Sequence, residues 1–200
     1  HRENTPLAAI EWNTDFEVLS WNQSAKRIFG FTKEDVLGKH ATQCIVPESA
    51  REAVDTVWRN LLDSRGGERS TNENITKDGR IILCEWYNTP LIDPDGTVIG
   101  VASLVDDVTE RTQAEKQLRH SEERFRSIIN ASPIPVALND DQQNIIDLNP
   151  EFIRTFGYDL NDIPTLAEWW PKAYPDAEYR QWVIDTWQAR LNQAKEHGTP

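Results

Sequence analysis

Aromatic and sulfur-bearing side chains are the first candidates for a chemical role in this sequence. It contains eight tryptophans in 200 residues, and large flat rings either fill a core or line a site for an apolar ligand. Along residues 80–89 the alternation of a strand places Cys84 and Trp86 on one face. Phe29 and Trp58 are expected to face the same space from helices, so these four side chains form the candidate pocket. Core packing and a dimer surface are the alternative for the tryptophans, and the sequence leaves open whether this space is filled or hollow.

The other reactive side chains do not form a recognisable catalytic set. No Ser/His/Asp or Cys/His arrangement has a useful spacing, and no glycine-rich loop is suited to cradling a phosphate. His40, Cys44 and Cys84 lack the paired spacing of a metal site, so a structural role is expected for His40. Residues 93–96, Asp-Pro-Asp-Gly, have the composition of a tight turn and lack the further ligands of a calcium loop. We therefore expect that this chain is not itself an enzyme and has no metal site.

The composition limits which binding partners and which cellular compartment are expected for this chain. The net charge of −12 argues against nucleic acid and against direct contact with an anionic membrane surface, because both attract clustered Lys and Arg. Only two cysteines are present, which favours a reduced, cytoplasmic setting over a disulfide scaffold. The longest apolar run, Val98 to Val105, is far too short to span a membrane. The chain begins at His1 and contains no Met, so we interpret it as part of a longer protein whose other parts can include membrane segments.

A repeated pattern indicates two related domains. The segment Val18 to Asn22 matches Ile145 to Asn149, and Phe29-Gly-Phe31 matches Phe156-Gly-Tyr158 at the same offset. In each copy an Asn is suited to cap a short helix, and a Gly is suited to end it in the left-handed conformation. A constant offset across a cap, a helix and a glycine stop favours duplicated domains.

The elements around the first copy predict an α+β fold. A five-stranded antiparallel sheet with helices over one face follows from strands separated by turn signals and from a clear amphipathic helix. The expected strands are 8–12, 16–21, 70–76, 80–89 and 98–105, and the expected helices follow Asn22 and cover 33–37 and 48–64. The second copy shows two strands, a short helix and a long helix over 176–197, without the three closing strands. Either the sequence stops inside this domain or the copy is degenerate, and we favour the first.

A connector between the copies runs from Gly100 to Phe125. It begins as a buried strand and continues as a charged helix, for which Asp107 is the expected cap and Glu110 the partner in a capping box. A heptad seam follows, with Arg111, Leu118 and Phe125 at a positions and Ala114, Ser121 and Ile128 at d positions. Arg111 and Ser121 weaken this seam, so a short, marginal coiled coil is expected, with Ala114, Leu118, Phe125 and Ile128 as its dimer contacts. A solvated spacer helix without a partner is the alternative.

Taken in order, these motifs resemble two PAS domains, the small sensor modules of bacterial signalling proteins. The residues that carry the likeness are Trp21-Asn22, Phe29-Gly30-Phe31, Val36-Leu-Gly38, Lys77-Asp-Gly79, Val98-Ile-Gly-Val101 and Asp107-Val-Thr109-Glu-Arg111. The resemblance implies a first domain over 1–107, a connector signalling helix over 108–125 and a partial second domain over 126–200. It also implies ligand sensing, dimerisation and relay through Asp107, Thr109 and Arg111 to an output domain, such as a histidine kinase or diguanylate cyclase, in the same parent chain.

The resemblance also identifies positions at which cofactor-binding PAS domains carry specific residues. A flavin adduct needs a cysteine where this chain has Ala41, and Val105 takes the place of a glutamine that contacts the flavin. Heme-binding members use a histidine where this chain has Val54. Both cofactors are therefore disfavoured. The segment His1 to Leu7 partly resembles the phosphoacceptor box of histidine kinases, but the strands expected after it disfavour that role.

We therefore expect this chain to be the sensory input and dimerisation region of a bacterial signal-transduction protein, acting as a homodimer. Two alternatives remain open. The first is a receptor defined by a bound flavin, heme or other small molecule, which a coloured protein would favour. The second is a ligand-free scaffold for protein–protein interaction, which requires a filled core.

Overall fold

The computed structural model describes residues 7–63 and 67–197. The chain divides into two compact units, His1–Gln117 and Leu118–Pro200. Each unit is built around its own cluster of buried apolar side chains.

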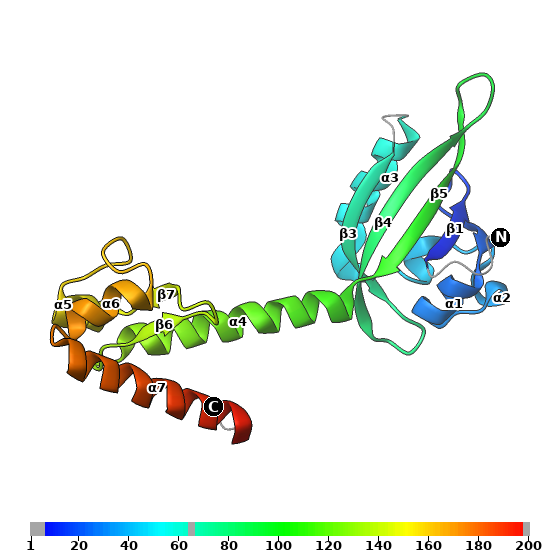
Figure 1. The fold of residues 1–200 in the computed structure, drawn as a ribbon. Coiled ribbons are helices and arrows are strands. Elements are labelled where there is room, and N and C mark those ends of the chain that lie inside the picture. The colour runs from blue at the N-terminus through cyan, green and yellow to red at the C-terminus, as the bar shows by residue number, and fades with distance from the viewer. Residues whose placement is uncertain (1–6, 64–66, 198–200) are drawn as a thin grey trace. The chain divides into compact units, whose positions relative to one another are not determined.

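A five-stranded antiparallel sheet forms the frame of the first unit, as predicted (Figure 1). Its strands lie in the order β2-β1-β5-β4-β3. Their bounds are Ala8–Trp12 for β1, Val18–Trp21 for β2, Glu68–Ile75 for β3, Ile81–Ile92 for β4 and Val98–Asp107 for β5. The central β5 pairs with both β1 and β4, so the first and last strands of the unit are neighbours.

Helices cover one face of this sheet, which confirms the α+β prediction (Figure 1). They are α1 (Gln23–Phe29), α2 (Lys33–Val36), the 3-10 helices η2 (Ala41–Gln43) and η3 (Glu48–Ala50), and α3 (Arg51–Leu62). Helix α3 contacts β3, β4 and β5, and its apolar side closes the core.

Both copies of the repeat use the predicted helix ends. The Asn22 side chain accepts a hydrogen bond at the start of α1, and Asn149 does the same at the start of α5 (Pro150–Phe156). Gly30 and Gly157 end these helices at φ 80° and 76°, where a residue with a Cβ is strained. The duplication inferred from the sequence is therefore confirmed at the level of local structure.

The predicted strand over 16–21 is shorter than expected. The Asn13 side-chain oxygen accepts hydrogen bonds from the backbone N–H groups of Asp15 and Glu17, which closes a tight turn. This turn holds Phe16 at φ 62° and directs the chain into β2, which starts at Val18. An Asx turn therefore replaces the first part of the strand.

Helix α4 spans Thr109–Ala131 and is longer than the expected connector. It does not start with the predicted capping box. Asp107 still belongs to β5, and the Val108 N–H donates to the Leu83 carbonyl at 2.9 Å, so the helix begins at Thr109. The Asp107 carboxylate accepts from both the N–H and the hydroxyl of Thr109, at 3.0 and 2.5 Å.

The second unit contains a two-stranded sheet and three helices besides its part of α4. The elements are β6 (Ala137–Asn139), β7 (Ile145–Leu148), α5, α6 (Leu166–Ala173) and α7 (Ala177–His197). Its small core contains the buried side chains of Ile145, Leu148, Phe152, Ile163 and Leu166. The sequence did not predict α6.

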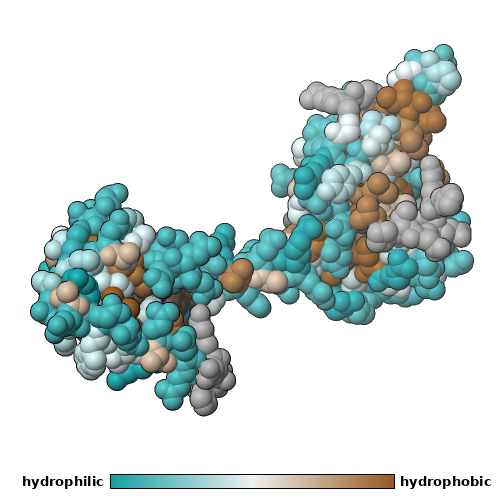
Figure 2. Space-filling model, in the orientation of Figure 1, coloured by the Kyte–Doolittle hydropathy of each residue, from teal (hydrophilic) through white to brown (hydrophobic). Residues whose placement is uncertain are grey.

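The surface of the first unit carries apolar side chains over β4 and β5 (Figure 2). Leu91, Ile92, Ile99 and Leu104 are exposed there. Over residues 7–63 and 67–197, no helix has both the length and the apolar character needed to cross a bilayer.

Candidate functional site

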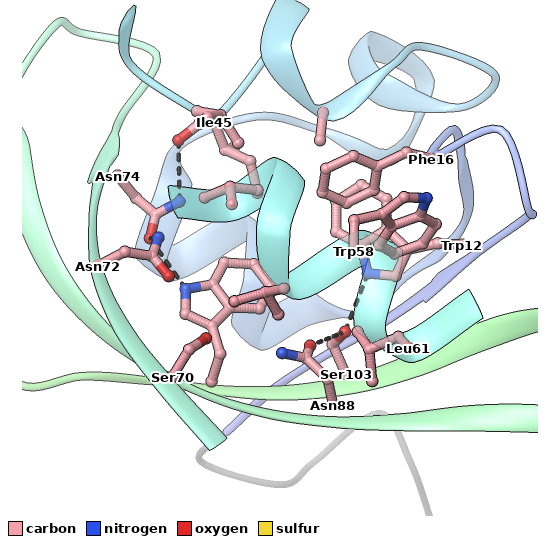
Figure 3. Close-up of a pocket in the computed structure, with 15 residues that line it drawn as sticks. Trp12, Phe16, Ile45, Trp58, Leu61, Ser70, Asn72, Asn74, Asn88 and Ser103 are labelled. Atoms are coloured by element: carbon pink, nitrogen blue, oxygen red, sulfur yellow. Dashed lines mark hydrogen bonds between the residues drawn. The ribbon is translucent and has the colours of Figure 1, made fainter. Parts of the chain in front are cut away.

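Four aromatic rings meet on the covered face of the first sheet (Figure 3). Trp12 comes from β1, Phe16 from the turn after it, Trp58 from α3 and Trp86 from β4. The Phe16 and Trp58 rings are stacked, with their centroids 3.9 Å apart, and the Trp12 ring lies 5.0 Å from Phe16. Trp86 lies 6.4 Å from Trp12 on the other side. The separations of 5.0 and 6.4 Å fall in the usual range of favourable aromatic pairs, and the Phe16–Trp58 stack is closer than that range.

One chain of hydrogen bonds runs along the edge of this cluster. The Trp12 indole N–H donates to the Ser103 hydroxyl at 3.0 Å, and that hydroxyl donates to the Asn88 side-chain oxygen at 2.6 Å. All three side chains are buried. Because buried polar groups need partners, this chain allows polar side chains within an apolar core.

A second chain lies across the cluster from the first. The Trp86 indole N–H donates to the Asn74 side-chain oxygen at 3.0 Å, and the Asn72 side-chain N–H₂ donates to the same oxygen at 3.1 Å. Asn74 in turn donates to the backbone carbonyl of Ile45 at 2.9 Å. This bond joins β3 to the segment that follows η2.

A small cavity lies between the rings and these two chains. Its volume is about 30 Å³, which is room for one or two water molecules. The side chains that line it are aromatic, aliphatic, hydroxyl-bearing or amide-bearing, and none of them is ionisable. The lining residues are Trp12, Phe16, Ala41, Ile45, Val46, Val54, Val57, Trp58, Leu61, Ser70, Asn72, Asn74, Trp86, Asn88 and Ser103.

Two of the four predicted pocket residues line this cavity. Trp58 and Trp86 are among its walls. Phe29 and Cys84 are fully buried in the surrounding core, and the Phe29 ring lies 6.2 Å from that of Trp86. Burial raises the pKa of the Cys84 thiol far above its ordinary value, so this group is an inert part of the core.

The positions that the resemblance linked to cofactors lie in or beside the same space. Ala41 and Val54 line the cavity, and Val105 is buried in the core. None of these side chains can form a thioether bond or ligate iron. The residues present therefore do not fit a flavin adduct or an axially ligated heme.

His40 has the structural role that the sequence predicted. Its ring Nδ1 lies 2.8 Å from the Thr42 hydroxyl and accepts from the Thr42 N–H at 3.3 Å, which caps η2. In the described part of the chain, no group of three or more His, Cys, Asp or Glu side chains is arranged to hold a metal ion. His1, the candidate phosphoacceptor, lies outside the described residues.

Strand β4 also anchors the start of α4, through backbone groups in the plane of the sheet just beyond the end of β5. The Thr109 hydroxyl accepts from the Leu83 N–H at 2.8 Å, and the Val108 N–H donates to the Leu83 carbonyl. Leu83 alternates with Cys84 along the strand, so it points away from the core that holds the cavity. Of the predicted relay residues, Thr109 thus bonds directly to β4, and Asp107 at the end of β5 accepts from Thr109.

Arg111, the third predicted relay residue, contacts the same strand through a charge. Its guanidinium lies 3.9 Å from the Glu85 carboxylate, which also bonds to Arg69 on β3 and to the Tyr87 hydroxyl. The hydrogen bond from Arg69 and then that from Tyr87 hold the pKa of Glu85 below its ordinary value. We call Glu85, Arg69, Tyr87 and Arg111 the Glu85 cluster.

The predicted dimer seam faces solvent along α4. The exposed fractions of Leu118, Phe125 and Ile128 are 63%, 53% and 59%, and Ala114 is exposed as well. Side chains of this size and exposure are available to a partner helix.

The polar walls of the cavity were not predicted. Ser70, Asn72 and Asn74 alternate along β3, and Asn88 and Ser103 face them from β4 and β5. The signal was present as a period of two in Ser-x-Asn-x-Asn, which is the spacing of one strand face.

Comparison with known proteins identifies the family to which this architecture belongs. A family model described as "PAS fold" matches residues 3–113, and one described as "PAS domain" matches residues 123–189. This chain belongs to the PAS family. Its first PAS domain contains the sheet, the cavity and the start of α4. Its second PAS domain contains the repeated capped helix.

Curated relatives of this PAS chain are signalling proteins. The biofilm dispersion protein BdlA of Pseudomonas aeruginosa is 24% identical over 157 residues, covering 76% of this chain and 35% of that protein. Sporulation kinase E of Bacillus subtilis is 27% identical over 169 residues, covering 80% of this chain and 21% of that protein. The chain thus spans about a third or less of the length of these relatives.

A solved structure supports the fold itself. The crystal structure of a PAS domain from Colwellia psychrerythraea aligns with a TM-score of 0.52 at 16% identity, covering 55% of this chain and 92% of that one. The chain therefore consists of PAS sensory domains of the kind found in signalling proteins.

Proposed function

We propose that this chain is the sensory input and dimerisation region of a bacterial signal-transduction protein. In this proposal the first PAS domain, over 1–107, detects the signal. The connector, over 108–125, carries the signal towards the partial second domain, over 126–200, and an output domain of the same parent protein. A histidine kinase output is supported by the similarity to sporulation kinase E, and a diguanylate cyclase is the other candidate. We place this region in the cytoplasm.

The observation that carries the proposal is the double role of β4. On its covered face, Trp86 and Asn88 line the cavity. The backbone of Leu83 holds the start of α4 through Val108 and Thr109, and the Glu85 side chain, on the other face, lies 3.9 Å from Arg111. A change in packing around Trp86 therefore acts on the strand to which the helix is bonded, which gives a short physical route from the cavity to the connector.

Dimerisation is proposed to use α4. The heptad spacing of Leu118, Phe125 and Ile128 places them along one side of the helix, and all three are exposed. A second copy that packs in parallel would bury these side chains. The apolar surface over β4 and β5 offers a further contact between copies.

The relay can be tested with two matched substitutions in the full chain. Trp86→Phe alters the cavity wall on β4, whereas Trp21→Phe alters an equally buried indole on β2. We expect Trp86→Phe to change hydrogen exchange at the Val108 amide more than Trp21→Phe does, after correction for global stability. Equal changes in the two variants would show that the cavity and the connector are not coupled through β4.

A second candidate function is a ligand-free scaffold. It is favoured by the size of the cavity, about 30 Å³, because the aromatic rings already occupy most of the space. The two functions differ in whether a small molecule binds. Native mass spectrometry of the full chain separates them, because a retained adduct mass would contradict the scaffold and a clean mass of the chain alone would contradict a ligand held at the cavity.

A further inference from the structure

Trp182 and Tyr179 form an exposed aromatic pair on α7, in the second PAS domain. Their rings are stacked, with 5.7 Å between the centroids and an angle of 19° between the planes. The exposed fractions of the two side chains are 60% and 54%. Aromatic side chains are usually well buried, and a contiguous exposed patch of them often marks an interaction site. This pair therefore needs an explanation other than core packing.

The internal repeat shows that the fold does not require an aromatic residue at this place. The run Val54-Asp-Thr56 of α3 matches Ile184-Asp-Thr186 of α7. This alignment places Trp182 where α3 has Glu52, which is exposed. Val54 packs against the first core, and two residues along a helix are separated by roughly 200° around its axis. Trp182 thus lies on the side of α7 that corresponds to the solvent side of α3.

Contacts with the rest of the second unit hold the pair in place. The Tyr179 ring lies 5.8 Å from that of Tyr174, which lies 6.0 Å from that of Trp170. Trp170 in turn packs against the small core. The Tyr179 N–H donates to the Asp176 carboxylate at 2.8 Å, which fixes the first turn of the helix. Side chains that are already held in position lose little conformational entropy when a partner binds.

Two carboxylates flank the aromatic pair. Glu178 and Asp185 lie four residues before and three residues after Trp182, and this spacing makes each of them a neighbour of the indole on the helix surface. Within residues 7–63 and 67–197, neither carboxylate has an ion pair. The guanidinium of Arg180 donates instead to two backbone carbonyls that precede the helix. The surface around Trp182 is therefore both aromatic and negatively charged.

This combination favours a cation as the occupant. A positive group within about 6 Å of a ring centroid is attracted by the electron-rich face of the ring, and the two carboxylates add to that attraction. An anionic group would be repelled by the same carboxylates. Among protein side chains, arginine fits best, because its planar guanidinium can stack on an indole and donate two hydrogen bonds to a carboxylate. The net charge of −12 attracts a basic partner as well.

We propose that Trp182, Tyr179, Glu178 and Asp185 form a docking site for an arginine side chain in a basic segment of a partner protein. The guanidinium stacks on the Trp182 ring and donates hydrogen bonds to the adjacent carboxylates. This inference goes beyond the proposed sensory function, because it requires neither a ligand in the cavity nor a relay through β4.

The first test measures binding of short, end-capped peptides to the full chain by isothermal titration calorimetry. In one peptide arginine alternates with glycine, and in the other two lysine or glutamate replaces the arginine. We expect the arginine peptide to bind about threefold more tightly than the lysine peptide, from one further hydrogen bond, and the glutamate peptide not to bind. No binding of the arginine peptide, or equal affinity for the arginine and lysine peptides, would overturn the proposal.

A pair of substitutions at Trp182 tests the role of the ring. Trp182→Leu keeps an apolar side chain but removes the aromatic face, so we expect it to weaken the arginine peptide about fivefold. Trp182→Phe keeps a ring and should retain part of this affinity. Leu160→Ala, at another exposed site of the second unit, is the control and should bind normally. Equal affinity in the leucine and phenylalanine variants would contradict a contact between the cation and the ring.

A second pair separates the local carboxylates from the overall negative charge. Glu178→Gln combined with Asp185→Asn should weaken the arginine peptide about fivefold and reduce the effect of added salt on its affinity. Glu122→Gln combined with Glu123→Gln removes the same charge from exposed positions on α4 and should leave the affinity nearly unchanged. Equal weakening in both double variants would show that the peptide responds to net charge alone, which would overturn the site.

Sedimentation velocity of the chain without peptide tests whether the occupant is a second copy. We expect Trp182→Leu to leave self-association unchanged, which supports a different protein as the partner. Self-association that is weakened by Trp182→Leu would mean that another copy of this chain occupies the site, and would overturn the assignment to a separate partner.

Discussion

The Thr109 hydroxyl accepts a hydrogen bond from the backbone N–H of Leu83, with 2.8 Å between the oxygen and the nitrogen. Together with the bond from the Val108 N–H to the Leu83 carbonyl, it makes one residue of β4 the attachment point of α4. The N–H and the C=O of Leu83 are thus both hydrogen-bonded, although the β4–β5 ladder ends one residue away, at the pair Cys84 and Asp107. The start of the connector is therefore determined by the strand.

The first prediction concerns this attachment. Thr109→Ala removes the acceptor and leaves the Leu83 N–H without a protein partner, so we expect a loss of about 1 kcal/mol in the free energy of unfolding. Hydrogen exchange at the Leu83 amide should become faster. Thr109→Ser keeps the hydroxyl and serves as the control. Equal protection of the Leu83 amide in both variants would contradict the role given to the hydroxyl.

The second prediction concerns the pH dependence of the Glu85 cluster. Hydrogen bonds from Arg69 and Tyr87 lower the pKa of Glu85 from its ordinary value of 4.5. A lowered pKa in the folded state stabilises the fold above the unfolded pKa, and this contribution is lost as the pH falls through the folded pKa. We therefore expect the urea midpoint to fall as the pH is lowered from neutral to below 4.5.

A pair of variants isolates the Glu85 contribution. Glu85→Gln should show a weaker dependence of the urea midpoint on pH over this range, because its side chain does not titrate. Glu123→Gln, which alters an exposed carboxylate on α4, should keep the full dependence. If both variants follow the unsubstituted chain, the cluster does not contribute to acid stability.

The third prediction concerns the close approach of β1 and β5. A Cβ added at Gly100 would lie 2.5 Å from the Trp12 carbonyl oxygen, and the contact is with backbone that cannot turn away. Gly100→Ala should therefore separate the ends of these strands and cost about 1–3 kcal/mol. Circular dichroism during thermal unfolding would measure the effect. An unchanged midpoint would mean that the strand ends can part without loss of packing.

The fourth prediction concerns the proposed seam. Leu118→Glu combined with Phe125→Glu places two charges on the side of α4 that we propose to be buried in the dimer. We expect the association constant, measured by sedimentation velocity, to fall at least about tenfold. Gln113→Glu adds a charge off the seam and should leave association unchanged. Association that persists in the double variant would place the dimer contact elsewhere.

Much of the fold follows from local signals in the sequence. The caps at Asn22 and Asn149 and the glycine stops at Gly30 and Gly157 were predicted from residue type and spacing, because each satisfies a backbone requirement within one turn. Strand β1 has the predicted bounds. The order of strands in the sheet also follows once the motifs are placed in the PAS family.

The missed features depend on contacts between distant segments or on competing signals. Helix α6 was not predicted because Pro171 lies inside it, although Thr165 and Glu168 form the capping box that marks its start. The start of α4 was misplaced because the bond between Val108 and Leu83 links residues far apart in sequence.

The candidate cavity was only partly predicted for the same reason. An apolar or polar pattern identifies the face of a strand, and it placed Trp86 correctly. It cannot show that Phe16 would stack on Trp58, because that contact depends on the left-handed turn at Phe16. It also cannot show whether the remaining space is large enough for a ligand.

The proximity of the indoles has a practical consequence. The rings of Trp58 and Trp86 each lie 6.4 Å from that of Trp12, and a fixed, asymmetric environment of this kind gives aromatic groups their near-ultraviolet circular dichroism. A change in the packing of any of these three rings would alter the electronic coupling between them. The protein thus carries an intrinsic optical reporter of the packing around its cavity, which can be followed without attaching a dye.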